Sequence, residues 1–315
     1  MRPSRNEKRG AQSPQAGGFL QPAWDRGGFS GSLHAYSRAE ARSHRGFTLV
    51  ELLAIVSVLL LLGIALTSTL ASTKSGSAGF VCMNNLRQLG SAWKMYADDS
   101  GGNLVYNTDG GSAGTIPSAR SWVAGWLDFN GGQPSGSGAD TNVLMLINHD
   151  SYPYGAYLGP YLNGDATVFR CPADDSVVSI AGRPYHRVRS YSMNNTFGPG
   201  SRMWTVPSKY THHLTLSDVK HPSQLFIIIE EHKGSINDGC FLSDPDTAWQ
   251  MIDRPAAYHN SGCNFVFVDG HTEQHRWTDF RTTPVPEPGF LMPLNVNLPG
   301  DLDIPWLQQH AAEMP

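Results

Sequence analysis

The chain contains one long apolar run without a charged residue, from 52 to 73, and its first part, Leu52–Leu66, reads LLAIVSVLLLLGIAL. A helix rises ~1.5 Å per residue, so a helix over this run is long enough to cross a hydrocarbon core of ~30 Å. Three arginines precede the run, whereas only Lys74 closely follows it. The positive-inside rule then predicts a single pass through the inner (cytoplasmic) membrane, with a cytoplasmic N-terminus and a periplasmic or otherwise extracytoplasmic body.

Two other interpretations of the apolar run remain open. It could be a buried core helix, or the core of a cleaved secretory signal whose small-residue site Thr69-Leu70-Ala71 would give a mature terminus at Ser72. Glu51, directly before the run, argues against the second interpretation. A carboxylate placed centrally in a span costs about 2.5–3.5 kcal/mol, so we expect Glu51 to have a partner.

Charge separates the first 46 residues from the rest of the chain. Residues 1–46 hold 8 Lys+Arg and 3 Asp+Glu, a balance of +5, which leaves 15 basic and 24 acidic residues from the totals of 23 and 27, a balance of −9. Nucleic-acid binding requires clustered Lys and Arg, so an acidic body excludes a nucleic-acid partner. The 33 Gly and 21 Pro of the 315 residues exclude a helical bundle and predict many loops.

Apolar positions after the run predict that the helix continues to residue 98, with an amphipathic second half against the body. Strands are expected at 187–193, 225–229, 264–268 and 272–277. The last two are separated by Asp269-Gly270-His271, which predicts a hairpin because Asp-Gly tolerates the positive φ angles of a tight turn. Prolines such as Pro284, Pro293 and Pro305 predict an extended or loose tail over 282–315.

The segment HNSGCNFVFVDGH places His259, Asp269, Gly270 and His271 around this hairpin. Imidazole and carboxylate groups at adjoining strand ends, with Glu230 or Glu231, could ligate a divalent transition metal or form a catalytic centre. The structural interpretation is favoured: Asp269-Gly270 makes the turn and His259 hydrogen-bonds across the hairpin base. The sequence has no serine nucleophile elbow, HExxH motif or phosphate-binding loop, so we predict that the protein is not an enzyme.

Two further sets of residues leave their chemistry open. Calcium could bind acidic residues in a loop region, although no EF-hand spacing organises them, and solvated turns are the favoured interpretation: Asp238, Asp244, Asp246 and Asp253. The four cysteines lie outside any CxxC pair, and in an exported domain they could form two disulfides in any of three connectivities: Cys82, Cys171, Cys240 and Cys263. The prediction is therefore no cofactor, with a divalent cation (calcium or a transition metal) left open.

Residues 45–51, RGFTLVE, followed by the apolar run resemble the class III signal of type IV prepilins and type II secretion pseudopilins. The resemblance implies cleavage after Gly46 by a prepilin peptidase/methyltransferase, N-methylation of Phe47, and an assembly role for Glu51. A carboxylate at this place can pair with a neighbouring subunit's terminal ammonium group within a helical bundle. The 46-residue leader is longer than usual in this family and its composition predicts disorder, so the true start codon could lie downstream.

Four other segments strongly resemble large pseudopilin-like proteins of planctomycetes and verrucomicrobia with a C-terminal H-x9-DG module: residues 82–90, 169–174, 190–194 and 259–270. The resemblance covers most of 46–277 and implies a pilin-like α+β fold, with a long N-terminal hydrophobic helix packed on an antiparallel β-sheet body with long loops. The predicted organisation is a leader over 1–46, a transmembrane and assembly helix over 47–98, an extracytoplasmic body over 99–281 and a Pro-rich tail over 282–315.

The predicted function is that of a structural subunit in a type II secretion or type IV pilus-like assembly, with other pseudopilin subunits, the membrane and the processing peptidase as partners. The alternative is a membrane-anchored extracytoplasmic protein that binds carbohydrate or another ligand, with three tryptophans as stacking surfaces: Trp122, Trp126 and Trp204. An enzyme dependent on His259 is the third interpretation.

Overall fold

The computed structural model describes residues 47–110, 113, 120–131, 138–200 and 209–315, without the side chains of 63–76. The predicted leader, including Gly46, lies outside the described residues. The chain separates into two units, Met1–Val56 and Ser57–Pro315. The second unit contains the body and all the sheets.

Helix α1, Leu49–Asp99, begins at a capping box. The Thr48 backbone N–H donates to Glu51 Oε2 at 2.8 Å, and the Glu51 N–H donates to Thr48 Oγ1 at 3.3 Å. These two bonds satisfy N–H groups that the first helical turn leaves without partners. Thr48 is therefore the N-cap of α1 and Glu51 its partner in the capping box, and the bonds from Thr48 lower the pKa of Glu51.

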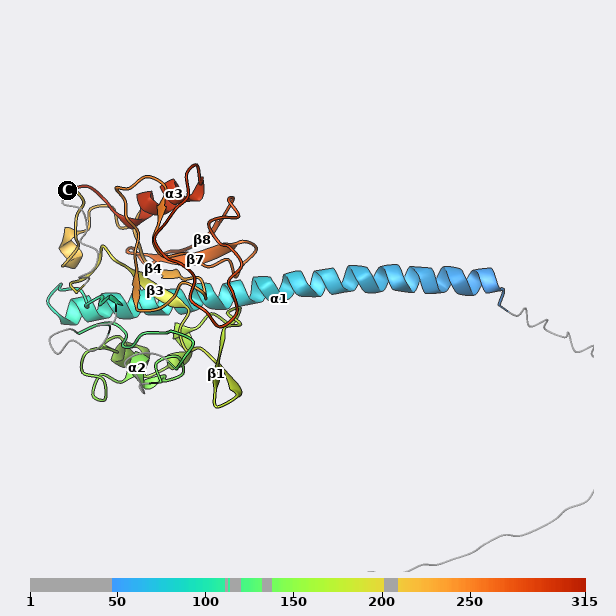
Figure 1. Ribbon diagram of the computed structural model, residues 1–315, viewed down its shortest axis with the longest axis horizontal. Helices are drawn as coiled ribbons and strands as arrows, with labels where there is room; N and C mark the ends of the chain where they lie inside the picture. The colour runs from blue at the N-terminus through green and yellow to red at the C-terminus, as the bar shows by residue number, and fades with distance from the viewer. Residues whose placement is uncertain (1–46, 111–112, 114–119, 132–137, 201–208) are drawn as a thin grey trace, which may run out of the picture. The chain divides into compact units, whose positions relative to one another are not determined.

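The C-terminal half of α1 is amphipathic and lies against the body. Leu86, Leu89 and Trp93, at helical spacing, are fully buried. A Cβ at Gly90 would lie 2.7 Å from Val266 Cγ2, so only glycine lets the helix approach the sheet this closely. Figure 1 shows this half of α1 between the sheet on one side and the segment around α2, Leu144–Ile147, on the other.

A five-stranded sheet forms the centre of the body, in the order β5-β3-β4-β7-β8. Its paired neighbours are antiparallel except β3 and β5, which are parallel. The predicted hairpin is confirmed as β7 and β8, with Gly262 opposite Arg276 and Val266 opposite Thr272. The strands are β3 Tyr191–Asn194, β4 Phe226–Glu230, β5 Cys240–Phe241, β7 Gly262–Phe267 and β8 Thr272–Arg276.

The remaining elements are short and surround the sheet. Two small sheets pair β1 with β2 and β6 with β9. These elements are η2 Gly159–Leu162, η3 Ala166–Phe169, β1 Val177–Ile180, β2 Arg183–His186, η4 Leu216–Asp218, β6 Gln250–Met251, β9 Val296–Asn297 and α3 Asp303–Ala311.

The central sheet has a hydrophobic core on each face, because side chains alternate along its strands. On β7, Val266 joins the core beneath α1, whereas Phe265 and Phe267 join a second core with α3. Ile304 and Leu307 of α3 complete that second core. The Pro-rich tail is therefore not a loose extension: it contains β9 and α3 and covers one face of the sheet.

The predicted fold class is wrong. The sheet is mixed, since β5 pairs parallel with β3. No helix within the described residues is long and apolar enough to cross a membrane. The predicted transmembrane helix and the single-pass inner-membrane location are therefore corrected.

Candidate site at a buried disulfide

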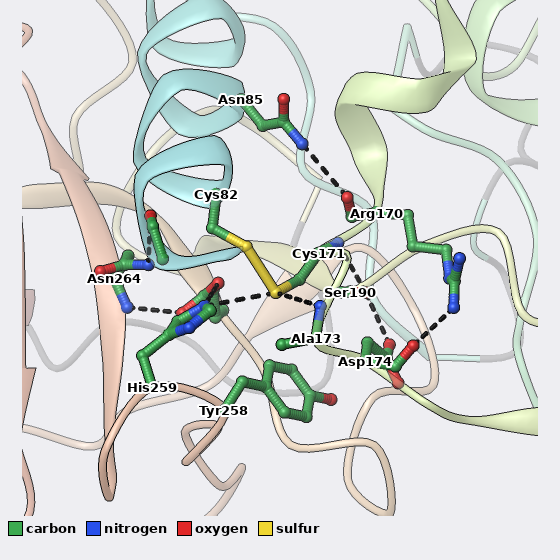
Figure 2. Close-up of a disulfide and its surroundings, with 12 residues drawn as sticks. Cys82, Asn85, Arg170, Cys171, Ala173, Asp174, Ser190, Tyr258, His259 and Asn264 are labelled. Atoms are coloured by element: carbon green, nitrogen blue, oxygen red, sulfur yellow. Dashed lines mark hydrogen bonds and ion pairs between the residues drawn. A yellow bond between two sulfur atoms is a disulfide. The ribbon is translucent and has the colours of Figure 1, made fainter. Parts of the chain in front are cut away.

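Four sequence segments that lie far apart along the chain meet at one buried place. Cys82 comes from α1, Cys171 from the loop after η3, Ser190 from the residue before β3, and His259 from the turn before β7. Figure 2 shows their side chains directed toward a common centre. These are the segments that carry the predicted resemblance, and the structure brings together their cysteines and the histidine of the H-x9-DG module.

A disulfide between Cys82 and Cys171 lies at this centre. Both residues are fully buried, and 89 positions separate them in the sequence. The bond links α1 covalently to the body. Of the three connectivities left open by the sequence, none forms completely, because Cys240 and Cys263 are free and buried. Burial raises the pKa of both free thiols well above the usual value.

The His259 imidazole lies against the disulfide. Its Nε2 atom is 3.3 Å from Cys171 Sγ and 3.0 Å from Glu230 Oε1, and the residue is only 2% exposed. Its Nδ1 atom has no hydrogen-bond partner within the described part of the chain and lies near Gly79 of α1. A ring proton on Nε2 fits this environment, because Glu230 Oε1 lies within reach as its acceptor.

The backbone of His259 forms a local turn with Gly262 at the start of β7, while its side chain points elsewhere. The His259 N–H donates to Gly262 O at 3.1 Å, and the Gly262 N–H donates back at 3.0 Å. The bond that reaches His259 across the hairpin base comes from β8, where Gln274 Nε2 donates to the His259 carbonyl oxygen at 2.7 Å. The imidazole instead crosses to Glu230 on β4, a partner from a strand 29 residues earlier.

Glu230 is fully buried and holds its two oxygens in different contacts. Oε1 faces His259, and Oε2 accepts the Asn264 backbone N–H at 2.6 Å. Burial raises the pKa of this carboxyl group, and the bonds from His259 and Asn264 oppose that rise. The bond from Asn264 fixes the orientation of the carboxyl group and leaves Oε1 directed at the disulfide side.

Polar groups also fix the Cys171 loop. The Cys171 N–H donates to Ser190 Oγ at 3.1 Å, and Ser190 Oγ–H donates to Asp174 Oδ2 at 2.6 Å. From α1, Asn85 Nδ2 donates to the Arg170 carbonyl oxygen at 3.2 Å. Asp174 and Ser190 are buried, so these bonds hold the loop in one position (Figure 2).

The ligating atoms of Cys82, Cys171, Glu230 and His259 all lie within 4.8 Å of one another. This buried group could hold a metal ion, with the two sulfur atoms at disulfide distance in this structure. Sequence reasoning found His259 and Glu230 as candidate ligands but did not connect them with the cysteines. The signal for that connection was the presence of both cysteines in the segments of the resemblance.

The other end of the H-x9-DG module does not join this group. Asp269 lies past the far end of β7 from His259, and its side chain is 36% exposed. Its Oδ1 accepts the backbone N–H of His271 at 3.0 Å and lies 2.6 Å from His271 Nδ1. Gly270, at φ 92°, completes the turn as predicted. His271 and Asp269 thus form a local pair at the hairpin turn.

The acidic residues considered for calcium do not converge either. Asp238 accepts the N–H of Cys240 at 2.7 Å, and Asp253 accepts that of Leu242 at 2.6 Å, both inside the body. Asp244 accepts Thr247 Oγ1–H at 2.6 Å in a local turn, and Asp246 pairs with Lys209. Among the residues described, these carboxyl groups therefore serve as backbone, turn and ion-pair acceptors.

A second buried polar cluster lies beside β3 and β4. Arg189 donates to the Tyr191 carbonyl oxygen at 3.0 Å, and Ser235 Oγ–H donates to Glu231 Oε1 at 2.7 Å. Burial raises the pKa of Glu231 to about 8 and that of Asp238 to about 7. Both carboxyl groups are buried in the core.

The two described tryptophans of the ligand-binding alternative are both at least partly buried. Trp122 is fully buried, and its Nε1–H donates to the Gly239 carbonyl oxygen at 3.0 Å. Trp126 is half-buried, and Trp204 lies outside the described residues.

Comparisons with family models, curated proteins and solved structures find no match to this chain.

Proposed function

We propose that the chain is a pseudopilin-like structural subunit of a type II secretion or type IV pilus-like assembly, processed to a mature terminus at Phe47. The exposed apolar surface of α1 carries this proposal. The large apolar side chains between Leu49 and Leu62 are 44–75% exposed. A continuous apolar surface of this kind is a site of association, because leaving it in water is unfavourable.

We propose that the corresponding helices of other subunits pack against this surface. Its apolar residues include consecutive positions such as Leu59, Leu60 and Leu61, so they surround the helix and do not form a single stripe. A helix that is hydrophobic on all sides is suited to the centre of a bundle. The Cys82–Cys171 disulfide links the C-terminal half of α1 covalently to the body of the same subunit.

Glu51 has two candidate roles in such an assembly. Its carboxylate caps α1 through Thr48, and in a bundle it could instead pair with the Phe47 ammonium group of a neighbouring subunit. Glu51→Gln keeps the capping geometry and removes the charge, whereas Glu51→Ala removes both. If the charge matters, both variants reduce crosslinking between subunits; if only the cap matters, Glu51→Gln assembles normally.

Processing gives the direct test of the proposal. Intact-mass and N-terminal analysis of the protein from its native cells should show an N-methylated Phe47 terminus, and Gly46→Val should leave precursor uncut. A matched change at Gly63, within the apolar run but outside the cleavage site, should leave processing unchanged. A mature terminus at Ser72 would contradict the proposal, because it is the product expected of ordinary signal peptidase.

For the cation that the sequence leaves open, we infer a transition metal, not calcium. Thiolate and imidazole donors suit zinc and similar ions, whereas calcium takes six to eight oxygen ligands. The one group of candidate ligands found among the described residues combines two sulfurs, one ring nitrogen and one carboxylate.

A further inference from the structure

We propose that the Cys82, Cys171, His259 and Glu230 group is a redox-selected cross-link: a disulfide when oxidised, and a tetrahedral zinc site when reduced. This inference rests on the proposed choice of a transition metal. In both states the same residues fasten α1 to the body, so the assembly helix stays attached under reducing conditions as well. The Cys82–Cys171 disulfide and the zinc ion exclude one another.

The spacing of the ligand atoms supports a tetrahedral site. Zinc lies about 2.3 Å from thiolate sulfur and about 2.0–2.2 Å from nitrogen or oxygen, so neighbouring ligand atoms are roughly 3.3–3.8 Å apart. His259 Nε2 is already 3.3 Å from Cys171 Sγ and 3.0 Å from Glu230 Oε1. The main change required is separation of the two sulfurs. The Cα atoms of the cysteines are 5.3 Å apart, and Cys171 lies in a loop, so small movements achieve this.

The second contact of one ligand, Glu230, favours the same site. Glu230 Oε2 is held by the Asn264 N–H, which leaves Oε1 as the ligand atom. A metal on His259 Nε2 requires the ring proton on Nδ1, for which the described residues offer no acceptor, so this ligand lacks such an outer contact. Such outer contacts orient metal ligands and commonly change affinity 10–100-fold when removed.

The redox step is an ordinary thiol–disulfide exchange. A dithiol reductant attacks one sulfur, the Cys82–Cys171 bond breaks, and the resulting mixed disulfide is resolved by the second thiol of the reductant. The reductant loses two electrons and becomes a cyclic disulfide, while the protein gains two thiols. Zinc then binds both thiolates, and their two protons pass to solvent.

Access to the disulfide requires local opening, because both cysteines are fully buried. A groove of about 460 Å³ lies alongside, and its lining includes Arg170 and Pro172, the residues on either side of Cys171. It also includes Val81 and Asn85 of α1. Separation of the loop from the helix along this groove gives a reductant or a metal ion a route to the sulfurs.

The test uses the full chain, refolded with a phosphine reductant and titrated with Co²⁺, a spectroscopic substitute for zinc. We expect one Co²⁺ per chain, with thiolate charge-transfer bands and the intense visible bands of a tetrahedral site, and displacement by Zn²⁺. Cys82→Ser removes one of the two thiolates and should weaken both the charge-transfer bands and the binding, and His259→Ala should weaken binding at least 10-fold. The double variant Cys240→Ala/Cys263→Ala is the matched control and should bind as the wild type does, because the group excludes these two buried cysteines.

A second measurement does not depend on variants that fold poorly. Bound Zn²⁺ should protect Cys82 and Cys171, but not Cys240 and Cys263, from alkylation in the reduced wild-type chain as it is partly unfolded with urea. Oxidation of the loaded chain should release one Zn²⁺ as the Cys82–Cys171 disulfide forms.

Contrary outcomes separate the two proposals. No uptake by the reduced chain, or uptake that Cys82→Ser leaves unchanged, overturns the metal assignment and the switch together. Metal retained after complete formation of the disulfide overturns the switch alone, because the two states would then coexist. Neither result bears on the processing of the chain at Phe47.

Discussion

The two ends of the H-x9-DG module differ in their surroundings, although the same hairpin carries both. His259 is 2% exposed and contacts residues from three other segments: Glu230, Cys171 and Gly79. Asp269 is on the surface and contacts mainly its own turn. A short motif thus combines a long-range core contact with a local turn, and its two named residues do not share a site.

This difference predicts that the buried long-range contact of His259 and the exposed local contact of Asp269 contribute unequally to stability. A buried polar side chain that loses its partner leaves that partner without compensation, which costs much more than the loss of a solvated contact. The His259 end should therefore dominate the stability of the body. The following changes test this contrast, from the largest expected effect to the smallest.

The covalent link beside His259 should give the largest effect. Cys82→Ser removes a disulfide that closes a long loop, so the free energy of unfolding should fall by about 2–5 kcal/mol. Urea unfolding of the oxidised chain measures this change. Cys263→Ala is the control, because it changes a buried free cysteine and keeps the disulfide. A thiol reductant should lower the stability of the wild type and of Cys263→Ala by similar amounts. It should leave the stability of Cys82→Ser unchanged. An equal loss without reductant in both variants would show that packing, not the disulfide, causes the effect.

The imidazole itself should follow. His259→Ala leaves the buried Glu230 carboxyl group without its side-chain partner and opens space beside the disulfide, so we expect a loss of about 2–4 kcal/mol. The matched control is His271→Ala at the exposed end of the hairpin, where the loss should stay under about 1 kcal/mol. Thermal and urea unfolding of both variants measure the contrast. Similar losses in the two variants would mean that burial does not determine how much each end of the module contributes to the free energy of unfolding.

Sequence reasoning predicted the elements that depend on local pattern. The β7–β8 hairpin follows from alternation around Asp269-Gly270, because turn chemistry acts over a few residues. The parallel pairing of β5 with β3 was not predictable, since β5 has only two residues and its position depends on Gly239 and Met193, far apart in sequence. The prediction of an extended or loose tail was wrong because the prolines do not prevent α3 from forming. Only Pro305 lies in α3, and it occupies the first turn, where a helix tolerates proline.

The site was only half predictable for a related reason. His259 and Glu230 were identified by residue type, but their contact joins β4 to the turn before β7 across the sheet. The pairing of Cys82 with Cys171 depends on how α1 crosses the body, which Gly90 and Val266 determine by close approach. Neither the His259–Glu230 contact nor the Cys82–Cys171 pairing produces a periodic pattern that can be recognised in a single sequence.

The second buried polar cluster, beside β3 and β4, should also give a pH dependence. The pKa of Glu231 is raised from 4.5 to about 8 because burial disfavours its charged form. As pH rises from about 5 to 8, the unfolded chain releases a proton that the native chain retains, so stability falls over this window and levels off above it. Glu231→Gln should flatten this slope in urea unfolding. Glu273→Gln, at an exposed position on β8, is the control and should leave the slope unchanged.

The smallest effect belongs to the exposed turn. Asp269→Asn keeps an oxygen that can accept the His271 N–H but removes the charge that pairs with the imidazole, so the loss should be under about 1 kcal/mol. Gly270→Ala should cost somewhat more, about 1 kcal/mol, because a Cβ at φ 92° strains the turn although no atom lies within 4 Å of it. High salt should reduce the Asp269→Asn effect, since an exposed pair is screened, and leave the Gly270→Ala effect unchanged, since backbone strain is not. A loss at Asp269 as large as that at His259 would show that the turn is coupled to the core, and the contrast between the two ends of the module would then be wrong.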